Sequence, residues 1–169
     1  MADVSEREHT RAAAMHGAMA GVLGAIAMAL LMMMVTAGQG GGFWTPLQLI
    51  GGVAFGSAWQ SLGSALLGAV IHLIVGAIVG AIYGLLTRRI EGTVYTTMLG
   101  MVFGIAVFAP ATYLILPAID PVMYGTMHLG VLFMAHIVYG LITGAAVGAL
   151  RHKRSDVAWP RVTRSVGPA

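Results

Sequence analysis

Two histidines, His72 and His136, are the residues whose type and spacing best suit chemistry inside a membrane. Each lies in a long apolar stretch, 16 residues before a basic residue near its end, which is Arg88 in one case and His152 in the other. At about 1.5 Å of helix rise per residue, both imidazoles are expected at matched depth, about 24 Å from the charged edge. A pair at one depth could supply both axial ligands of a haem b, since neutral imidazole is the ligating form.

The same two histidines have other interpretations. A buried neutral histidine can donate a hydrogen bond to a backbone carbonyl or hydroxyl of a neighbouring helix and so hold two helices together. The residues alone favour this structural role over the haem. Binding of a quinone or of another small ligand is a further possibility, because an ionisable residue within a span marks a functional candidate.

The methionines raise the question of copper transport. Met28, Met32, Met33 and Met34 follow one another along the first apolar stretch, and thioethers favour Cu(I). Methionine is also a flexible apolar filler, and the chain has no cysteine and no methionine-rich outer arm to capture the metal. Transport of copper or of a small solute is therefore a lesser alternative.

Other reactive patterns are missing. No Asp or Glu lies inside any of the four apolar stretches, and neither an H-E-x-x-H motif nor a phosphate-binding loop occurs. Asp120 and His128 could pair or help to hold a metal outside the spans, although a solvated turn is the simpler expectation. The sequence therefore predicts that the protein is not an enzyme working alone.

The positions of the histidines depend on four apolar stretches, each of which could cross a bilayer. Hydrophobic residues make up 58% of the 169 residues and charged residues only 9%, whereas soluble domains carry roughly 25% charged residues. A crossing takes about 20 helical residues. The four stretches run approximately over residues 17–37, 62–86, 95–116 and 125–150. We expect an all-α integral membrane four-helix bundle.

Charge placement predicts the orientation of this bundle. All nine Lys and Arg residues fall before the first stretch, between the second and third, or after the fourth. By the positive-inside rule both termini are cytoplasmic and the protein lies in the inner (plasma) membrane. The net charge of +3 therefore comes from basic residues expected at the cytoplasmic membrane surface. It does not predict nucleic-acid binding.

The second and fourth stretches share one pattern, which predicts two tandem helical hairpins. His72 and three following glycines, Gly76, Gly80 and Gly84, recur 64 residues later as His136, Gly140, Gly144 and Gly148. The first and third stretches match more loosely, Met19-Ala-Gly21 with Met98-Leu-Gly100 and Gly24 with Gly104. Glycines four residues apart allow two helix backbones to approach closely. We expect Gly-rich faces that pack the bundle, or that meet a second copy or another membrane subunit.

These features give the following organisation. Residues 1–16 form a polar N-terminal segment, of which residues 1–10 are expected to be mobile. Residues 17–150 form the four-helix domain, with repeats at about 17–86 and 95–150, and residues 151–169 form a basic tail. Residues 45–56 are expected as a short helix at the membrane interface, acting as a lipid anchor, lid or partner surface. Pro110 should kink the third helix.

The chain resembles a family of small, uncharacterised bacterial and archaeal membrane proteins, a domain of unknown function. The likeness rests on the Gly/Ala/Met-rich first stretch, the segment Phe43-Trp44-Thr45-Pro46-Leu47-Gln48-Leu49-Ile50, the two His-x-x-x-Gly motifs and the Pro-bearing third stretch. The resemblance implies a four-helix fold and carries no established activity. Together, these observations favour a non-catalytic accessory or scaffold protein, with a haem or quinone protein and a transporter as alternatives.

Overall fold

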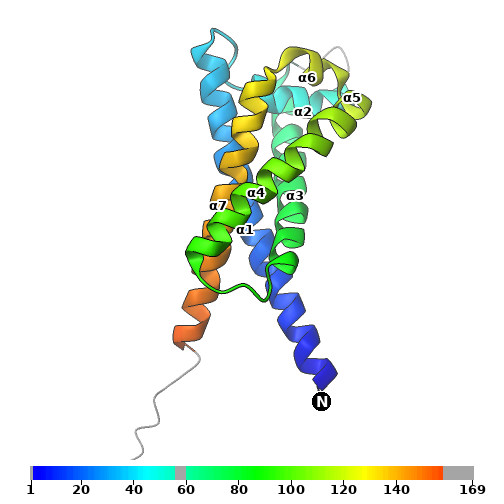
Figure 1. Ribbon diagram of the computed structural model, residues 1–169. Coiled ribbons are helices and arrows are strands. Elements are labelled where there is room, and N and C mark those ends of the chain that lie inside the picture. The colour runs from blue at the N-terminus through cyan, green and yellow to red at the C-terminus, as the bar shows by residue number, and fades with distance from the viewer. Residues whose placement is uncertain (1, 56–59, 158–169) are drawn as a thin grey trace, which may run out of the picture.

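The computed structural model describes residues 2–55 and 60–157 of the chain. Four long helices form the body of the protein (Figure 1): α1 (Ala2–Gly38), α3 (Leu62–Leu86), α4 (Thr93–Pro110) and α7 (Leu129–Val157). Three short helices lie at the end away from the N-terminus: α2 (Thr45–Phe55), α5 (Leu116–Ile119) and α6 (Pro121–Thr126). No strand occurs in the described ranges, which confirms the all-α fold class.

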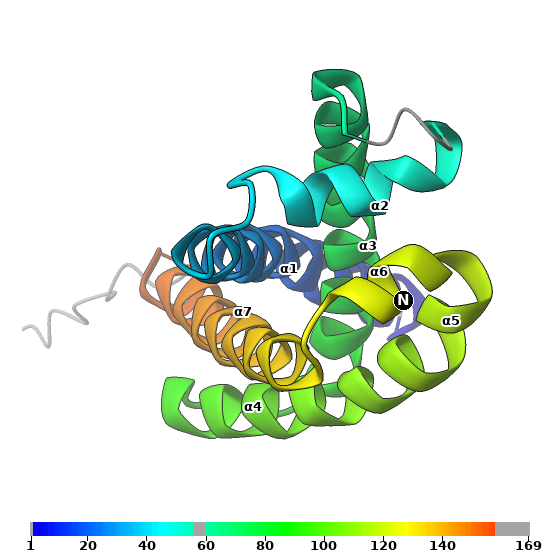
Figure 2. The same ribbon diagram turned by 90° about the horizontal axis from the view of Figure 1, so that it is seen from above.

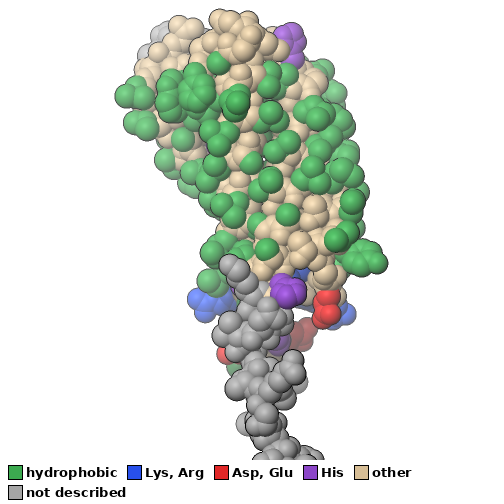
Figure 3. Space-filling model, turned by 90° about the vertical axis from the view of Figure 1, so that its left-hand side faces the viewer, with side chains coloured by type: hydrophobic (Ala, Val, Ile, Leu, Met, Phe, Trp, Pro, Cys, Tyr) green, Lys and Arg blue, Asp and Glu red, His purple; other side chains and the backbone are tan. Residues whose placement is uncertain are grey.

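Four segments are long and apolar enough to cross a membrane, as the sequence predicted. They are Val4–Gly38, Leu62–Leu86, Thr93–Ile119 and Leu129–His152. Figure 3 shows hydrophobic side chains over the upper and middle parts of one face, with the acidic and basic side chains gathered near its lower end. We call this lower end, where α1 begins and α7 finishes, the charged end.

The N-terminal segment, for which mobility was expected, is helical in the structure. Helix α1 begins at Ala2 and passes residue 16 without a break. Glu, Arg and Ala, which dominate these turns, are good helix formers, and Arg88 of the α3–α4 turn donates a hydrogen bond to Thr10 Oγ1 at 3.3 Å. At the other terminus α7 extends to Val157. The rest of the predicted tail lies outside the described residues.

The long helices pack as two crossing pairs, α1 with α3 and α4 with α7. Seen from above, α1 and α7 run side by side at the centre, while α3 and α4 lie on different flanks (Figure 2). Because small residues let backbones approach, the pairs meet at glycines. A Cβ on Gly21 would overlap the backbone of Gly76 and Gly80, and a Cβ on Gly100 would overlap that of Gly140 and Gly144.

Gly24 does not pack as the match between the first and third apolar stretches predicted. Gly104 packs against His136 and Gly140 in the second pair, and Ala25, one turn after Gly21, takes the corresponding position beside Gly76 in the first pair. Gly24, which the sequence comparison matched with Gly104, faces Tyr139 and Thr143 of α7 instead. The reason is rotational, since adjacent residues lie about 100° apart around a helix with 3.6 residues per turn. Gly24 thus serves the contact between the two pairs.

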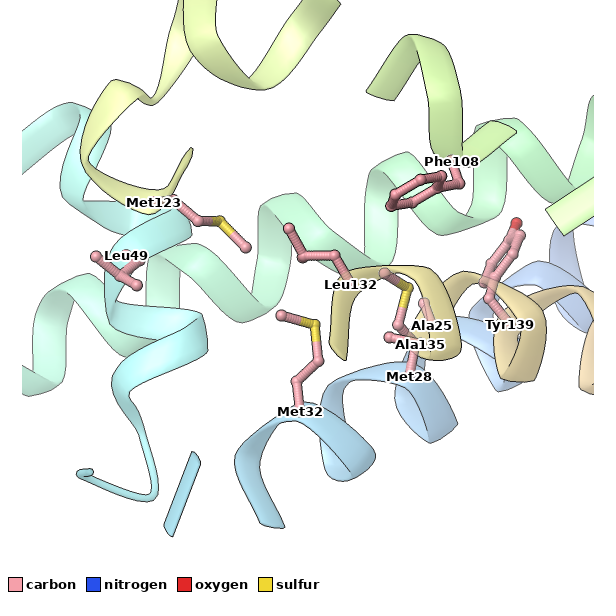
Figure 4. Packing of buried hydrophobic residues seen from close by; sticks show 9 residues of the cluster. All are labelled: Ala25, Met28, Met32, Leu49, Phe108, Met123, Leu132, Ala135 and Tyr139. Atoms are coloured by element: carbon pink, nitrogen blue, oxygen red, sulfur yellow. The ribbon is translucent and has the colours of Figure 1, made fainter. Parts of the chain in front are cut away.

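A cluster of buried apolar residues fills the space between the pairs on the side away from the charged end (Figure 4). It comprises Ala25, Met28, Met32, Leu49, Phe108, Met123, Leu132, Ala135 and Tyr139. Met28 and Met32 of α1 thus pack among apolar side chains of α7 and the short helices, whereas Met34 is exposed on the surface. This division suits methionine's use as an adaptable core filler.

Helix α2 forms as expected, but it packs on α3 and is not held by lipid alone. Leu47 and Leu49 are buried, and Ser64 Oγ donates to the carbonyl oxygen of Gln48 at 2.6 Å. A Cβ on Gly51 would overlap the carbonyl oxygen of Ser64, so the two helix backbones nearly touch. Helix α2 therefore covers the first helix pair at the end away from the charged end.

The third span changes from α-helix to π-helix after Pro110, the residue at which a kink was predicted. Regular α-helix ends at Pro110, and a π-helical segment, η2 (Ala111–Ile115), follows it. Proline lacks the amide hydrogen that the α-helical pattern needs, and π-bulges accommodate such interruptions. Asp120 then caps α6, its Oδ1 accepting from the amide of Met123 at 2.9 Å. This aspartate is buried, so the expectation of a solvated turn was wrong for its side chain.

Candidate functional site

His72 holds two helices together. It lies in α3, half-buried, and its Nε2 donates a hydrogen bond to the carbonyl oxygen of Ala25 in α1 at 3.0 Å. A carbonyl oxygen only accepts, so the neutral ring carries its hydrogen on Nε2 and leaves Nδ1 as an acceptor. This arrangement is the cross-helix hydrogen bond expected of a structural histidine.

His136 is bonded within its own helix. It is buried in α7, and its Nδ1 donates to the carbonyl oxygen of Leu132, one turn earlier, at 2.7 Å. Its ring packs edge-to-face against Phe108 of α4, with ring centroids 5.5 Å apart. The neutral ring therefore presents Nε2 as its unprotonated nitrogen, the atom able to accept a hydrogen bond or to ligate a metal.

The two histidines match in sequence but differ in structure. A shared haem would take one unprotonated nitrogen from each ring, which is Nε2 for His136 and Nδ1 for His72, whose Nε2–H is donated to Ala25. For a quinone, the useful group is an N–H that donates to the quinone carbonyl. His72 lines an apolar groove of about 280 Å³ between α1, α2 and α3, but its one N–H already has an acceptor. The geometry supports a structural role for His72.

We expect replacement of His72 by alanine to lower stability modestly and to leave the visible spectrum unchanged. Loss of one hydrogen bond between membrane helices costs on average about 0.6 kcal/mol and at most about 1.7 kcal/mol. The measurement is thermal unfolding in detergent, paired with oxidised and dithionite-reduced absorption spectra of protein expressed with ample haem. A Soret band that disappears in His72→Ala and in His136→Ala would contradict the structural role.

The six glycines predicted as packing residues all lie at the helix crossings within one chain. Gly76, Gly80 and Gly84 of α3 face Gly17, Gly21 and neighbouring residues of α1. Their counterparts in α7 face α4, and they are Gly140, Gly144 and Gly148. Because each of the six is already covered by a backbone or side chain of the same molecule, these glycines do not form an open face for a second copy.

Arg151 is a structural residue that sequence reasoning counted only as a topological charge. Its Nη1 donates to the carbonyl oxygens of Thr87 at 2.6 Å and Ile90 at 3.2 Å. Its Nη2 donates to the carbonyl oxygen of Gly84 at 2.9 Å and to Thr87 Oγ1 at 3.3 Å. The guanidinium therefore caps the C-terminal end of α3, where unpaired carbonyls and the helix dipole favour a cation. Its position after the last apolar turn of α7 was the only sequence signal.

Two tyrosines form cross-helix hydrogen bonds that sequence reasoning also missed. The hydroxyl of Tyr83 in α3 donates to the carbonyl oxygen of Thr96 in α4. The hydroxyl of Tyr139 in α7 donates to the carbonyl oxygen of Gly76 in α3 at 2.8 Å. A buried tyrosine needs a partner for its hydroxyl, which was the available signal. These bonds connect the two helix pairs at positions that the repeat does not share.

A cavity of about 520 Å³ lies at the charged end. The first turns of α1 line one side, and Arg88, Arg89 and Arg151 contribute from the ends of α3 and α7. A second cavity of about 380 Å³ lies beside the α3–α4 turn and shares Arg88 and Arg151. Polar and basic side chains thus surround the cavities of the charged end, while the groove beside His72 is apolar.

Comparisons with known proteins give one family and no further relative. No curated protein and no solved structure shows significant similarity to the chain. The model of a family of unknown function, DUF6789, matches residues 12–157, which include all four membrane-length helices from Ala12 onward. The match confirms the predicted resemblance to a domain of unknown function, and the chain belongs to the DUF6789 family.

Proposed function

We propose that the protein is a non-catalytic accessory or scaffold component of a complex in the inner membrane. The observation that carries this proposal is that His72 and the buried apolar side chains between the helix pairs are engaged in contacts between helices. His72 holds the Ala25 carbonyl, and an apolar cluster fills the space between the helix pairs. Within the described residues, the interior is filled by packed side chains and contains no group of reactive side chains. Such an interior suits a protein that supports other membrane proteins.

The glycine contacts refine this proposal. The two helix pairs use glycines of the G-x-x-x-G type in the same register, Gly21 against Gly76 and Gly80, and Gly100 against Gly140 and Gly144. We infer a duplicated hairpin whose glycines serve each copy internally. A partner subunit would therefore meet the remaining apolar surface or the charged end, and self-association through the glycine faces is disfavoured.

Crosslinking in native membranes tests the accessory role. The tagged chain is crosslinked in membranes of its own host and purified in two mild detergents, and co-purifying proteins are quantified by mass spectrometry. We expect a defined membrane protein at a constant ratio in both detergents, absent from an unrelated four-span control. Two differently tagged copies separate self-association from partner binding. A chain that runs alone at 17.5 kDa without crosslinks would overturn the proposal.

The orientation has a direct test, because the chain has no native cysteine. Gln39 follows α1 at one end, and Glu91 lies in the α3–α4 turn at the charged end; both are exposed. With cytoplasmic termini, Gln39→Cys should react with a membrane-impermeant maleimide on intact cells. Glu91→Cys should react only after permeabilisation. The reverse pattern would contradict the predicted orientation.

The haem protein remains a second candidate because of one observation. His136 donates from Nδ1 to Leu132, which leaves Nε2 able to ligate. His72, whose Nε2–H is donated to Ala25, would offer Nδ1 as the second ligand. The copper alternative has weaker support, because Met28 and Met32 pack in the apolar cluster and Met34 faces outward.

A further inference from the structure

We propose that the 520 Å³ cavity at the charged end binds a phosphate-bearing anion, such as the headgroup of an anionic phospholipid. The cavity lies between the first turns of α1 and the ends of α3 and α7. In Figure 1 the start of α1 and the end of α7 diverge on either side of the α3–α4 turn. This proposal does not depend on the accessory role.

The cavity gathers positive charge. Arg88, Arg89 and Arg151 line it, and Glu6 is the one acidic side chain in its lining. Three arginines against one glutamate leave a formal excess of two positive charges with the histidines neutral. His9 also lines the cavity. An anion is the ligand class that such a lining attracts.

Two of the three arginines are held in place. Arg151 is fixed by its hydrogen bonds to the end of α3, and every one of those acceptors is neutral, so its positive charge is not cancelled. Arg88 is held to Thr10 of α1 by one hydrogen bond and keeps further N–H groups for a ligand. Arg89 is exposed. Arg88 and Arg89 thus supply direct donors, and Arg151 supplies a fixed field.

The chemistry and the depth of the cavity both favour phosphate. Arginine presents a planar fork of donors that matches two phosphate oxygens. Arg88 and Arg89 follow directly after the last turn of α3, at the boundary of the span, which is the level of lipid phosphates. Basic cavities between membrane helices are known sites for anionic headgroups. Thr10 and Ala13 of α1 also line the cavity.

Native mass spectrometry of the detergent-purified protein tests the proposal. The probes are dioleoyl phosphatidylglycerol, dioleoyl phosphatidylcholine and inorganic phosphate, each titrated separately. We expect phosphatidylglycerol to bind in preference to phosphatidylcholine. Arg88→Gln/Arg89→Gln should weaken this binding by at least about tenfold, because hydrogen bonds to charged groups are among the stronger ones. The matched control is Arg7→Gln/Arg11→Gln, which removes two charges from the same end outside the cavity lining.

The outcomes separate the sources of the phosphate. Loss of phosphatidylglycerol in the Arg88/Arg89 variant alone supports the site and makes a lipid its ligand. Binding of inorganic phosphate with the same dependence supports the site and makes free phosphate its ligand. Equal losses in both double variants, or no preference over phosphatidylcholine together with no phosphate binding, would overturn the proposal. If the double variant does not fold, Arg89→Gln alone serves, because Arg89 lies beyond the end of α3.

Discussion

Replacing Gly140 by alanine is expected to cost about 3 kcal/mol of stability, at the upper end of the range for overpacking substitutions. The added Cβ would lie 2.9 Å from the carbonyl carbon of Gly100 and 3.0 Å from Cα of Gly104. These are backbone atoms of α4, so no side chain can rotate away and the helix pair must separate. Thermal unfolding in detergent, with size-exclusion chromatography, measures the loss.

Gly130 provides the matched control on the same helix. A Cβ on Gly130 would meet nothing within 4 Å. Gly130→Ala should therefore be neutral or stabilise α7 by at most about 1 kcal/mol, the difference in helix propensity. If Gly140→Ala were as stable as Gly130→Ala, the close crossing of α4 and α7 would be wrong. A change of oligomeric state without loss of stability would instead assign Gly140 to an interface between copies.

Replacing Arg151 by methionine should destabilise the protein by about 3 kcal/mol. Methionine keeps an apolar stem but removes all four hydrogen bonds to the end of α3, including those to the carbonyl oxygens of Gly84 and Thr87. Hydrogen bonds to charged groups contribute about 1.5–3 kcal/mol each, and contributions within one cluster do not add fully. Urea or thermal unfolding in detergent measures the change.

Two variants separate the cap from the charge. Arg151→Lys keeps a cation near the C-terminus of α3, worth about 0.3–1 kcal/mol, but cannot reach several carbonyls with a planar fork. We expect it to recover only a minor part of the loss. Arg89→Met removes an exposed arginine from the same turn and should change stability little. Equal effects of Arg89→Met and Arg151→Met would show that net charge matters and the cap does not.

The spans were predictable because membrane crossing depends on properties that a sequence lists directly. Apolar length sets the number of crossings, and the predicted ranges agree with the four membrane-length helices to within several residues at most ends. The exception is the beginning of α1, where polar residues were expected to be mobile. Helix propensity continues there, and the α3–α4 turn provides a partner for Thr10 through Arg88. That contact joins residues 78 positions apart in the sequence, so no local sequence pattern could predict it.

The positions of the candidate site residues could be predicted from the sequence, but their hydrogen-bond partners could not. The spacing of His72 and His136 placed both inside spans, yet one donates across to α1 and the other along its own helix. A repeat in sequence predicts matching surroundings only where the neighbours repeat as well. Here the neighbours differ, because α1 lies beside α7 at the centre while α3 and α4 lie apart on the flanks.

The sequence by itself determined the number of spans, the gathering of basic residues at one end and the faces on which glycines align. It did so because length, charge and period are properties of one helix. Only the tertiary structure decided that Gly24 faces α7, that Arg151 caps α3 and that arginines of the α3–α4 turn and of α7 meet the start of α1 in one cavity. These contacts depend on how each helix is rotated and which helix it meets. The physical reason is that the packing of the whole bundle sets the rotation of each helix and its partner. No local sequence pattern determines either.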